Sequence, residues 1–278
     1  MLLWKCPSCS NVLLLNNKVW ACANGHSYDV AKEGYVNLLL AQHKNSKQPG
    51  DNKQMVNGRR AFLEQGFYQP LADSISHIFN QHLATYKTQT EVNFFDAGCG
   101  EGYYMAQVSQ LCIQTDLKIK FSGLDISKFA VQKAAKKYPN NHFAVASTFQ
   151  LPLESNSQDA VLQIFAPSSE IEIHRVLKPS GIWITVNPAA NHLYEFKQAL
   201  YDKPTEHKSG QVTPEGFALV QQLNISFVIQ LGEPQQRENL LMMTPYYWSA
   251  TAEKKQNLVD NLKQFTTDFD IKVFAKLA

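Results

Sequence analysis

The stretch Asp96-Ala97-Gly98-Cys99-Gly100-Glu101-Gly102 decides how this chain folds. It follows the apolar run 92–95 and precedes a predicted helix that begins at Tyr103. Alternate glycines after a buried strand let the backbone turn sharply and approach a ligand, because no β-carbon stands in the way. The free N–H groups at the start of the helix then face that ligand. The pattern predicts a doubly wound α/β sheet with a ligand site at this loop.

The spacing of the glycines indicates which ligand binds. A dinucleotide fingerprint reads Gly-x-Gly-x-x-Gly and places a pyrophosphate on the helix N-terminus. Here the third glycine comes one residue earlier, which puts Glu101 at the rim of the loop. A carboxylate there repels a diphosphate but attracts the ammonium or sulfonium of S-adenosylmethionine (SAM). We therefore predict a SAM-dependent methyltransferase, whose cofactor contacts include Asp96, Gly98, Gly100, Glu101 and Gly102. A nicotinamide-dependent oxidoreductase is an alternative.

Helices and strands alternate from about residue 70. Strands are predicted at 92–97, 119–125, 142–145, 159–165, 182–186, 225–231 and 267–277, with helices at 71–86, 103–111, 127–138 and 238–248. Seven strands are typical of class I SAM-dependent methyltransferases, which are Rossmann-like. The predicted domains are a zinc ribbon at 1–37, a basic linker and helix at 38–69, and the methyltransferase domain at 70–278.

Ligands in open α/β sheets bind beyond the carboxyl ends of the strands, so residues that end strands are candidates for the site. Asp125 ends the second strand and is predicted to accept hydrogen bonds from a ribose diol. Ser147 follows the third strand, where an adenine ring would lie. Phe165 ends the fourth strand and is a candidate for stacking on a target base, with a core position as the alternative. Glu170 follows that turn and is a candidate general base.

Four residues near the N-terminus have metal-ligand spacing. Cys6, Cys9, Cys22 and His26 form the pattern C-x2-C-x12-C-x3-H, which is typical of a structural zinc shell. The residues between the two pairs suggest a strand, an Asn16-Asn17 turn and a second strand. We therefore predict a zinc ribbon, although the spacing alone also fits a strand-strand-helix finger.

Charge is distributed unevenly along the 278 residues, whose formal net charge is +2. Residues 1–60 contain eight Lys and Arg against three Asp and Glu. This excess favours contact with a polyanion, and a solvated surface is the alternative. Candidate RNA contacts are Lys44, Lys47, Lys53, Arg59 and Arg60, although this basic segment can also be read as a linker.

Composition limits the cellular context. No apolar run approaches the ~20 residues that cross a bilayer, so we expect no membrane association. The chain opens with Met1-Leu2-Leu3-Trp4-Lys5, which is too short for a signal peptide. Five cysteines, three of them with metal spacing, fit a reducing cytoplasm. The sequence leaves the oligomeric state open, with a homodimer as one option.

Together these motifs resemble the bacterial 23S ribosomal RNA (guanine-N1)-methyltransferases that carry a zinc ribbon, in particular their gamma-proteobacterial branch. The zinc shell and the segments 31–38, 49–51, 59–63, 68–71, 96–104 and 165–167 carry the resemblance. It implies methylation of N1 of a guanine in a hairpin loop of 23S ribosomal RNA. It also implies that Tyr68, Gly100, Glu101 and His192 contact SAM, and that the four predicted ligands hold zinc. Ser168, where cysteine is usual, and residues 187–190 depart from the family pattern.

Other functions remain open at this stage. The acceptor can instead be another RNA, a small molecule or a protein, or the chain can be a non-catalytic RNA-binding module. For the ribbon we expect RNA docking and no part in the chemistry. Replacing Cys6 and Cys9 should then abolish RNA binding and leave SAM affinity nearly intact, whereas equal loss of both would mean that the ribbon supports the whole fold.

Overall fold

The computed structural model describes residues 4–43, 46, 49–86, 91–112, 117–200 and 212–277. Its strands are β1 (Leu14–Asn16), β2 (Val19–Ala21), β3 (Ser27–Asp29), β4 (Val36–Asn37), β5 (Glu91–Ala97), β6 (Lys118–Asp125), β7 (His142–Val145), β8 (Gln158–Ile164), β9 (Leu177–Pro188), β10 (Phe217–Gln230) and β11 (Gln264–Lys276). Its α-helices are α1 (Lys53–Leu63), α2 (Gln69–Leu83), α3 (Tyr103–Leu111), α4 (Lys128–Lys137), α5 (Glu170–Val176), α6 (Tyr194–Leu200), α7 (Pro234–Met242), α8 (Tyr246–Ser249) and α9 (Ala252–Asn261). Short 3-10 helices lie at η1 (Ala41–His43) and η2 (Ala84–Tyr86).

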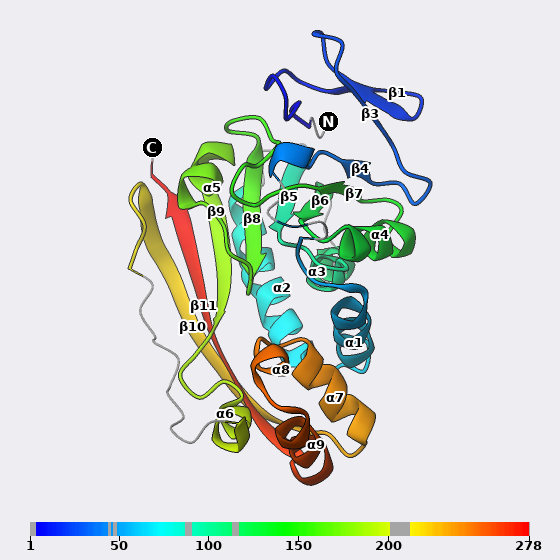
Figure 1. Cartoon of the computed structure of the whole chain (residues 1–278). Helices are drawn as coiled ribbons and strands as arrows, with labels where there is room; N and C mark the ends of the chain where they lie inside the picture. Colours follow the sequence, from blue (N-terminus) through cyan, green and yellow to red (C-terminus); the bar gives the residue numbers. More distant parts are fainter. Residues whose placement is uncertain are drawn as a thin grey trace.

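The main sheet has the order β10-β11-β9-β8-β5-β6-β7-β4 (Figure 1). Strands β4 to β9 of this sheet run parallel, and β11 is antiparallel to both β9 and β10. The chain order reverses at β5, which pairs with β6 on one side and β8 on the other. Such a switch point opens a crevice at the carboxyl ends of the strands, and the glycine loop leaves β5 there. The predicted fold class is confirmed.

The strand number is a correction, because the sheet has eight strands among the described residues instead of seven. The seven predicted segments all form strands, and the additional one is β4, a two-residue strand at the end of the predicted ribbon domain. It pairs in parallel with β7, and the N–H of Leu38 continues the ladder with a 2.9 Å bond to the carbonyl of Val145. The N-terminal region is therefore joined to the edge of the catalytic sheet.

The two faces of the sheet are covered by different parts of the chain. Phe94 of β5 packs into a cluster with residues of α2, α3 and α4, whereas its neighbour Phe95 points to the opposite cluster. The second cluster contains Trp4, Leu13 and Trp20, which come from the ribbon region. The ribbon thus fills part of the hydrophobic core on one face, while α6 to α9 lie at the far end of the molecule (Figure 1).

The predicted ribbon hairpin is confirmed. Strands β1, β2 and β3 form an antiparallel sheet in that order. Asn17 in the β1–β2 turn has a φ of 55°, a left-handed conformation that asparagine tolerates.

Two predicted helices differ from the structure. The segment 238–248 is interrupted between α7 and α8, because Pro245 has no N–H for a continuous helix. The helix within 38–69, which the sequence pattern predicts to open at Arg59 and to run to about residue 65, begins earlier, at Lys53. The side chain of Asn52 caps it there by accepting bonds from the N–H groups of Gln54 and Met55. In the described part of the chain no helix has the length and apolar character that a membrane crossing requires.

Candidate active site and zinc centre

The glycine loop joins β5 to α3 and forms the floor of the site. Gly98 and Gly100 have φ values of 87° and 54°, in the left-handed region that favours glycine. Gly102 caps α3 and supplies no side chain, so the first N–H groups of the helix remain available to a ligand. A β-carbon on Gly100 would have the Arg59 Nη1 atom, at 3.7 Å, as its neighbour. The guanidinium of Arg59 therefore lies close to the glycine loop at Gly100.

Asp125 closes the loop from the end of β6. One carboxylate oxygen accepts a 3.0 Å bond from the N–H of Gly100, and the other accepts a 2.7 Å bond from the N–H of Ser127. Asp125, which is predicted to bind the ribose, thus also fixes the shape of the glycine loop. A carboxylate oxygen has more than one lone pair, so these two bonds leave capacity for a ribose diol.

Three acidic side chains surround the loop. Burial, followed by the charges of Asp125 and Glu101, raises the pKa of Asp96 to about 8. Burial also raises the pKa of Glu101 and of Asp125. The Oε1 atom of Glu101 is buried and has no hydrogen-bond partner among the described atoms. A buried carboxylate oxygen without a hydrogen-bond donor is costly, and the ammonium group of SAM can supply both a donor and a compensating charge.

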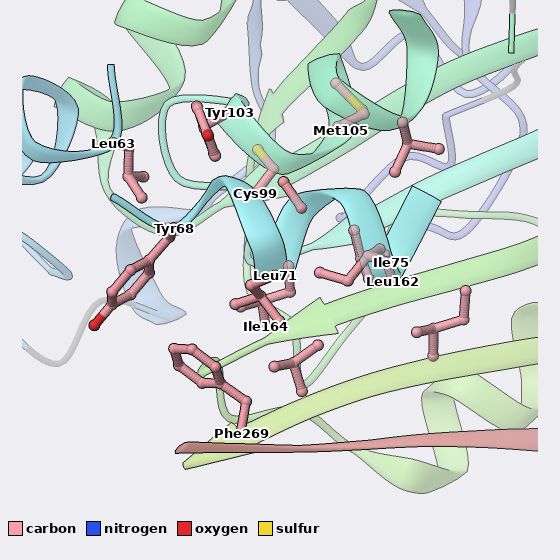
Figure 2. Packing of buried hydrophobic residues seen from close by; sticks show 14 of the residues in the cluster. Leu63, Tyr68, Leu71, Ile75, Cys99, Tyr103, Met105, Leu162, Ile164 and Phe269 are labelled. Carbon is pink, nitrogen blue, oxygen red and sulfur yellow. The ribbon is translucent and has the colours of Figure 1, made fainter. Parts of the chain in front are cut away.

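An aromatic wall stands beside the acidic pocket. Tyr68 at the start of α2 is buried, and its ring centroid lies 5.2 Å from that of Phe269 on β11. Figure 2 labels both side chains. The ring of His192 lies 4.7 Å from Phe269 and 6.5 Å from Tyr68. Its Nδ1 atom accepts a bond from the N–H of Asp268, which places the proton of the neutral imidazole on Nε2. Tyr68 and His192, which are far apart in sequence, therefore share one wall.

Phe165 lies where β8 ends, next to this wall. Its φ of 51° is uncommon for a bulky residue, and its side chain is 42 % exposed. The ring lies 6.1 Å from that of His192 and 5.7 Å from that of Phe269. Gln163 holds the turn by donating to the carbonyl of Ala166 and by accepting a 2.9 Å bond from the hydroxyl of Ser168. A strained and exposed aromatic residue at the crevice is compatible with base stacking, which stays a prediction.

The other predicted site residues lie around the same sheet edge. Ser147 lies two residues after the end of β7, and its hydroxyl accepts a bond from the N–H of Phe149. Thr148 donates a 2.6 Å bond to the carbonyl of Pro167, so the Ser147 loop and the Phe165 turn are tied together. Glu170 is exposed on the first turn of α5. The roles of Ser147 and Glu170 remain predictions.

The zinc ligands converge as the spacing predicts. The ligand atoms of Cys6, Cys9, Cys22 and His26 all lie within 4.8 Å of one another. The Sγ atoms of Cys9 and Cys22 are 3.7 Å apart, and Nδ1 of His26 lies 3.5 Å from the Sγ of Cys22. A tetrahedral zinc ion with ordinary bond lengths separates its ligands by roughly 3.4–3.8 Å. With two thiols and the imidazole already at this spacing, the residues fit a closed structural zinc site.

The candidate RNA contacts occupy different surroundings. Lys44 and Lys47 lie outside the described residues. Lys53 is exposed at the start of α1. Arg60 donates a 2.9 Å bond to Glu64. Arg59 instead forms an ion pair with Asp51 beside the glycine loop.

The sequence pattern does not predict the roles of two residues of this site. Asp51 lies in a segment that carries the family resemblance, and its backbone carbonyl accepts a 2.6 Å bond from the hydroxyl of Ser127. Gln163 organises the turn after β8. Neither contact has a signal in local periodicity, because each depends on how distant segments pack.

The fold and the site together define a class I SAM-dependent methyltransferase. Residues 89–259 match the family described as "Methyltransferase domain", and residues 4–47 match the zinc ribbon described as "RlmA, N-terminal". YxjB of Bacillus subtilis, whose name places it among the 23S rRNA (guanine-N1)-methyltransferases, is 31% identical over 99% of this chain and 97% of its own. The chain belongs to the family of 23S rRNA (guanine-N1)-methyltransferases.

The chain is also similar to two further proteins. The 23S rRNA (guanine(748)-N(1))-methyltransferase of Streptomyces fradiae is 33% identical over 76% of this chain and 72% of its own. The solved structure of the YcgJ protein from Bacillus subtilis has a TM-score of 0.43 and 16% identity, and the match covers 73% of this chain and 99% of that one. The gamma-proteobacterial branch stays a prediction.

Proposed function

We propose that this protein transfers a methyl group from SAM to N1 of a guanine in a hairpin loop of 23S ribosomal RNA. The names of the relatives in Bacillus subtilis and Streptomyces fradiae support guanine N1 of 23S ribosomal RNA as the methyl acceptor. The single observation that supports SAM as the cofactor is the buried carboxylate of Glu101 in the glycine loop, whose Oε1 atom has no hydrogen-bond partner among the residues that the structure describes. A cytoplasmic location and, as one option, a homodimer belong to the same proposal.

The cofactor supplies an activated methyl group on a sulfonium. The chain's own residues then act mainly by positioning, which is worth up to ~7–11 kcal/mol when the geometry is good. Asp125 orients the ribose, Glu101 meets a cationic group, and Ser147 lies where the adenine ring is expected. Tyr68 and His192 close the crevice with apolar surface.

The acceptor atom imposes two further requirements. Guanine N1 lies on the Watson–Crick edge, so the base must be unpaired or turned out of its stack. Phe165 is exposed at the crevice and supplies a ring on which such a base can stack. Guanine N1 also carries a proton, and Glu170 is the proposed base that accepts it. Glu170→Gln should reduce turnover without loss of SAM binding, and full turnover of this variant would remove Glu170 from the mechanism.

Calorimetry with purified full-length protein tests the cofactor. SAM should bind with one site per chain, and NAD should produce no heat of binding. The converse result would favour the oxidoreductase. Radiolabelled SAM offered with 23S ribosomal RNA, with another RNA, or with protein then tests the acceptor. Label in the 23S RNA alone is the expected outcome, and label in protein or in no RNA would contradict it.

A further inference from the structure

The segment just before α1 reaches the cofactor site. Gly50 has a φ of 78°, and a β-carbon there would lie 2.8 Å from the Cγ2 atom of Ile126 and 3.0 Å from the N atom of Ser127. The next residue, Asp51, accepts the Ser127 hydroxyl bond through its backbone carbonyl. Ser127 in turn donates its N–H to the carboxylate of Asp125. A series of contacts therefore links residues 50–51 to Asp125, the residue predicted to bind the ribose.

Arg59, which lies on α1, extends this series of contacts. Its guanidinium is ion-paired with the carboxylate of Asp51, and both side chains are largely buried, with exposures of 24% and 27%. The Nη1 atom lies 3.7 Å from the position of a β-carbon on Gly100. The cap by Asn52 and the contact of Gly58 with Met242 of α7 fix how α1 presents this side chain.

The electrostatics agree with this geometry. Burial lowers the pKa of the Arg59 guanidinium, but the carboxylates of Asp51, Glu101 and Asp125 raise it above its usual value. Reciprocally, the charge of Arg59 partly offsets the effect of burial on the pKa of Glu101 and of Asp125. Without this cation, several buried carboxylates would face one another with less compensation.

The neighbouring arginine gives a contrast on the same helix. Arg60 pairs with Glu64, which also accepts a 2.6 Å bond from Lys137 of α4. Adjacent helical residues point in directions about 100° apart, so Arg59 and Arg60 serve different surfaces. Arg60 belongs to a surface network, whereas Arg59 belongs to the acidic cofactor pocket.

We propose that Arg59 is a positioning residue of the cofactor site: through Asp51 it holds residues 50–51 against Ser127 and the glycine loop, and RNA contact is not its main role. The inference rests on the proposed function, since it presumes that SAM occupies the pocket above Gly100. Arg60 and Lys53 keep their predicted place as RNA contacts.

Calorimetric titration of SAM into full-length variants tests this inference. Loss of one charge-assisted, largely buried interaction should weaken SAM binding by about tenfold or more in Arg59→Ala. Arg59→Lys keeps the charge but not the planar fork and should recover part of the affinity. Arg60→Ala is the matched control and should bind SAM within about twofold of the wild type, because surface ion pairs contribute little. Asp51→Asn should resemble Arg59→Ala, and the double variant should lose less than the sum of the two single losses.

Three outcomes would overturn the inference. Arg59→Ala can bind SAM as tightly as the wild type while RNA affinity falls, which would make Arg59 an RNA contact. Arg60→Ala can weaken SAM binding as much as Arg59→Ala, which would mean a general loss of α1 packing. Should Arg59→Ala not fold, as thermal unfolding would reveal, unchanged SAM binding by Arg59→Lys and Asp51→Asn would still contradict it. If the wild type itself binds no SAM, the proposed function fails first.

Discussion

Gly98 and Ala166 are in direct contact across the crevice: a β-carbon built on Gly98 would lie 2.4 Å from the β-carbon of Ala166. The first residue belongs to the cofactor loop after β5, and the second to the turn after β8. The two halves of the proposed reaction centre therefore meet where the backbone of Gly98 faces the side chain of Ala166. A change in one of them must move the other.

Gly98→Ala should lower both stability and SAM affinity. A left-handed conformation costs a non-glycine residue roughly 1–2 kcal/mol, and overpacking against Ala166 adds about 1–3 kcal/mol. Urea unfolding and calorimetry measure the two losses. In the double variant Gly98→Ala with Ala166→Gly, the steric part should be recovered and the conformational part should remain. A double variant no better than the single one would show that the contact is not the cause.

Phe165→Ala should impair the reaction with RNA and leave SAM binding intact. Stacking on an aromatic ring contributes about 1–3 kcal/mol per base, which corresponds to a fall in kcat/KM of roughly 5- to 150-fold. Phe149→Ala is a matched control, because Phe149 is also exposed, at 60%, on the neighbouring loop. Methyl-transfer kinetics with saturating SAM provide the measurement. Equal effects of the two substitutions would argue against a specific stacking role for Phe165.

Removing zinc should destabilise the whole chain and not the ribbon alone. Trp4, Leu13 and Trp20 share a core cluster with Phe95 and Trp183 of the main sheet, so release of the ribbon exposes one face of the catalytic domain. Cys6→Ser or Cys9→Ser should therefore lower the free energy of unfolding by several kcal/mol. RNA binding and SAM binding should be lost together. A chelator titration followed by circular dichroism measures this, with zinc addition as the control. Persistent SAM affinity after complete zinc removal would restore the view of the ribbon as an independent RNA-docking module.

Asp96 should make the stability of the SAM-free protein depend on pH. Burial, together with the charges of Asp125 and Glu101, raises its folded-state pKa to about 8, well above the usual value of about 3.9. The folded state then binds more protons than the unfolded state between these values, so stability falls as pH rises toward 8. The contribution of this one group is at most about 1.4 kcal/mol per pH unit.

Asp96→Asn removes that titration. Its free energy of unfolding, measured in urea between about pH 5 and 8, should decline less steeply than that of the wild type and should exceed it at the upper end. Glu101 and Asp125 are shifted in the same direction and leave a residual slope in both proteins. Parallel curves for wild type and variant would mean that Asp96 does not hold a proton in the folded protein.

Sequence patterns predicted those features that depend on nearby residues. The seven long strands follow from apolar runs, and the zinc shell follows from four ligands whose spacing is short enough to close one loop. The position of Asp125 at the end of β6 could also be predicted, because strand ends in a parallel sheet meet at one edge. In each case the determining interactions lie within one or two neighbouring elements.

The missed features depend on distant packing. β4 has two residues, which is too short for any period, and its partner β7 lies more than 100 positions away. Asp51 meets Ser127 across 76 positions, so no local rule links them. Pro245 is the exception, because its lack of an N–H could have predicted the break between α7 and α8.

Primer extension on methylated RNA tests the central claim most directly. A methyl group on guanine N1 blocks the Watson–Crick edge, so reverse transcriptase should stop at one guanine of 23S RNA after incubation with the purified protein and SAM. Omission of SAM should abolish the stop, and Glu101→Gln should weaken it. Methyl incorporation that produces no stop, or a stop that forms without SAM, would contradict N1 methylation by this protein.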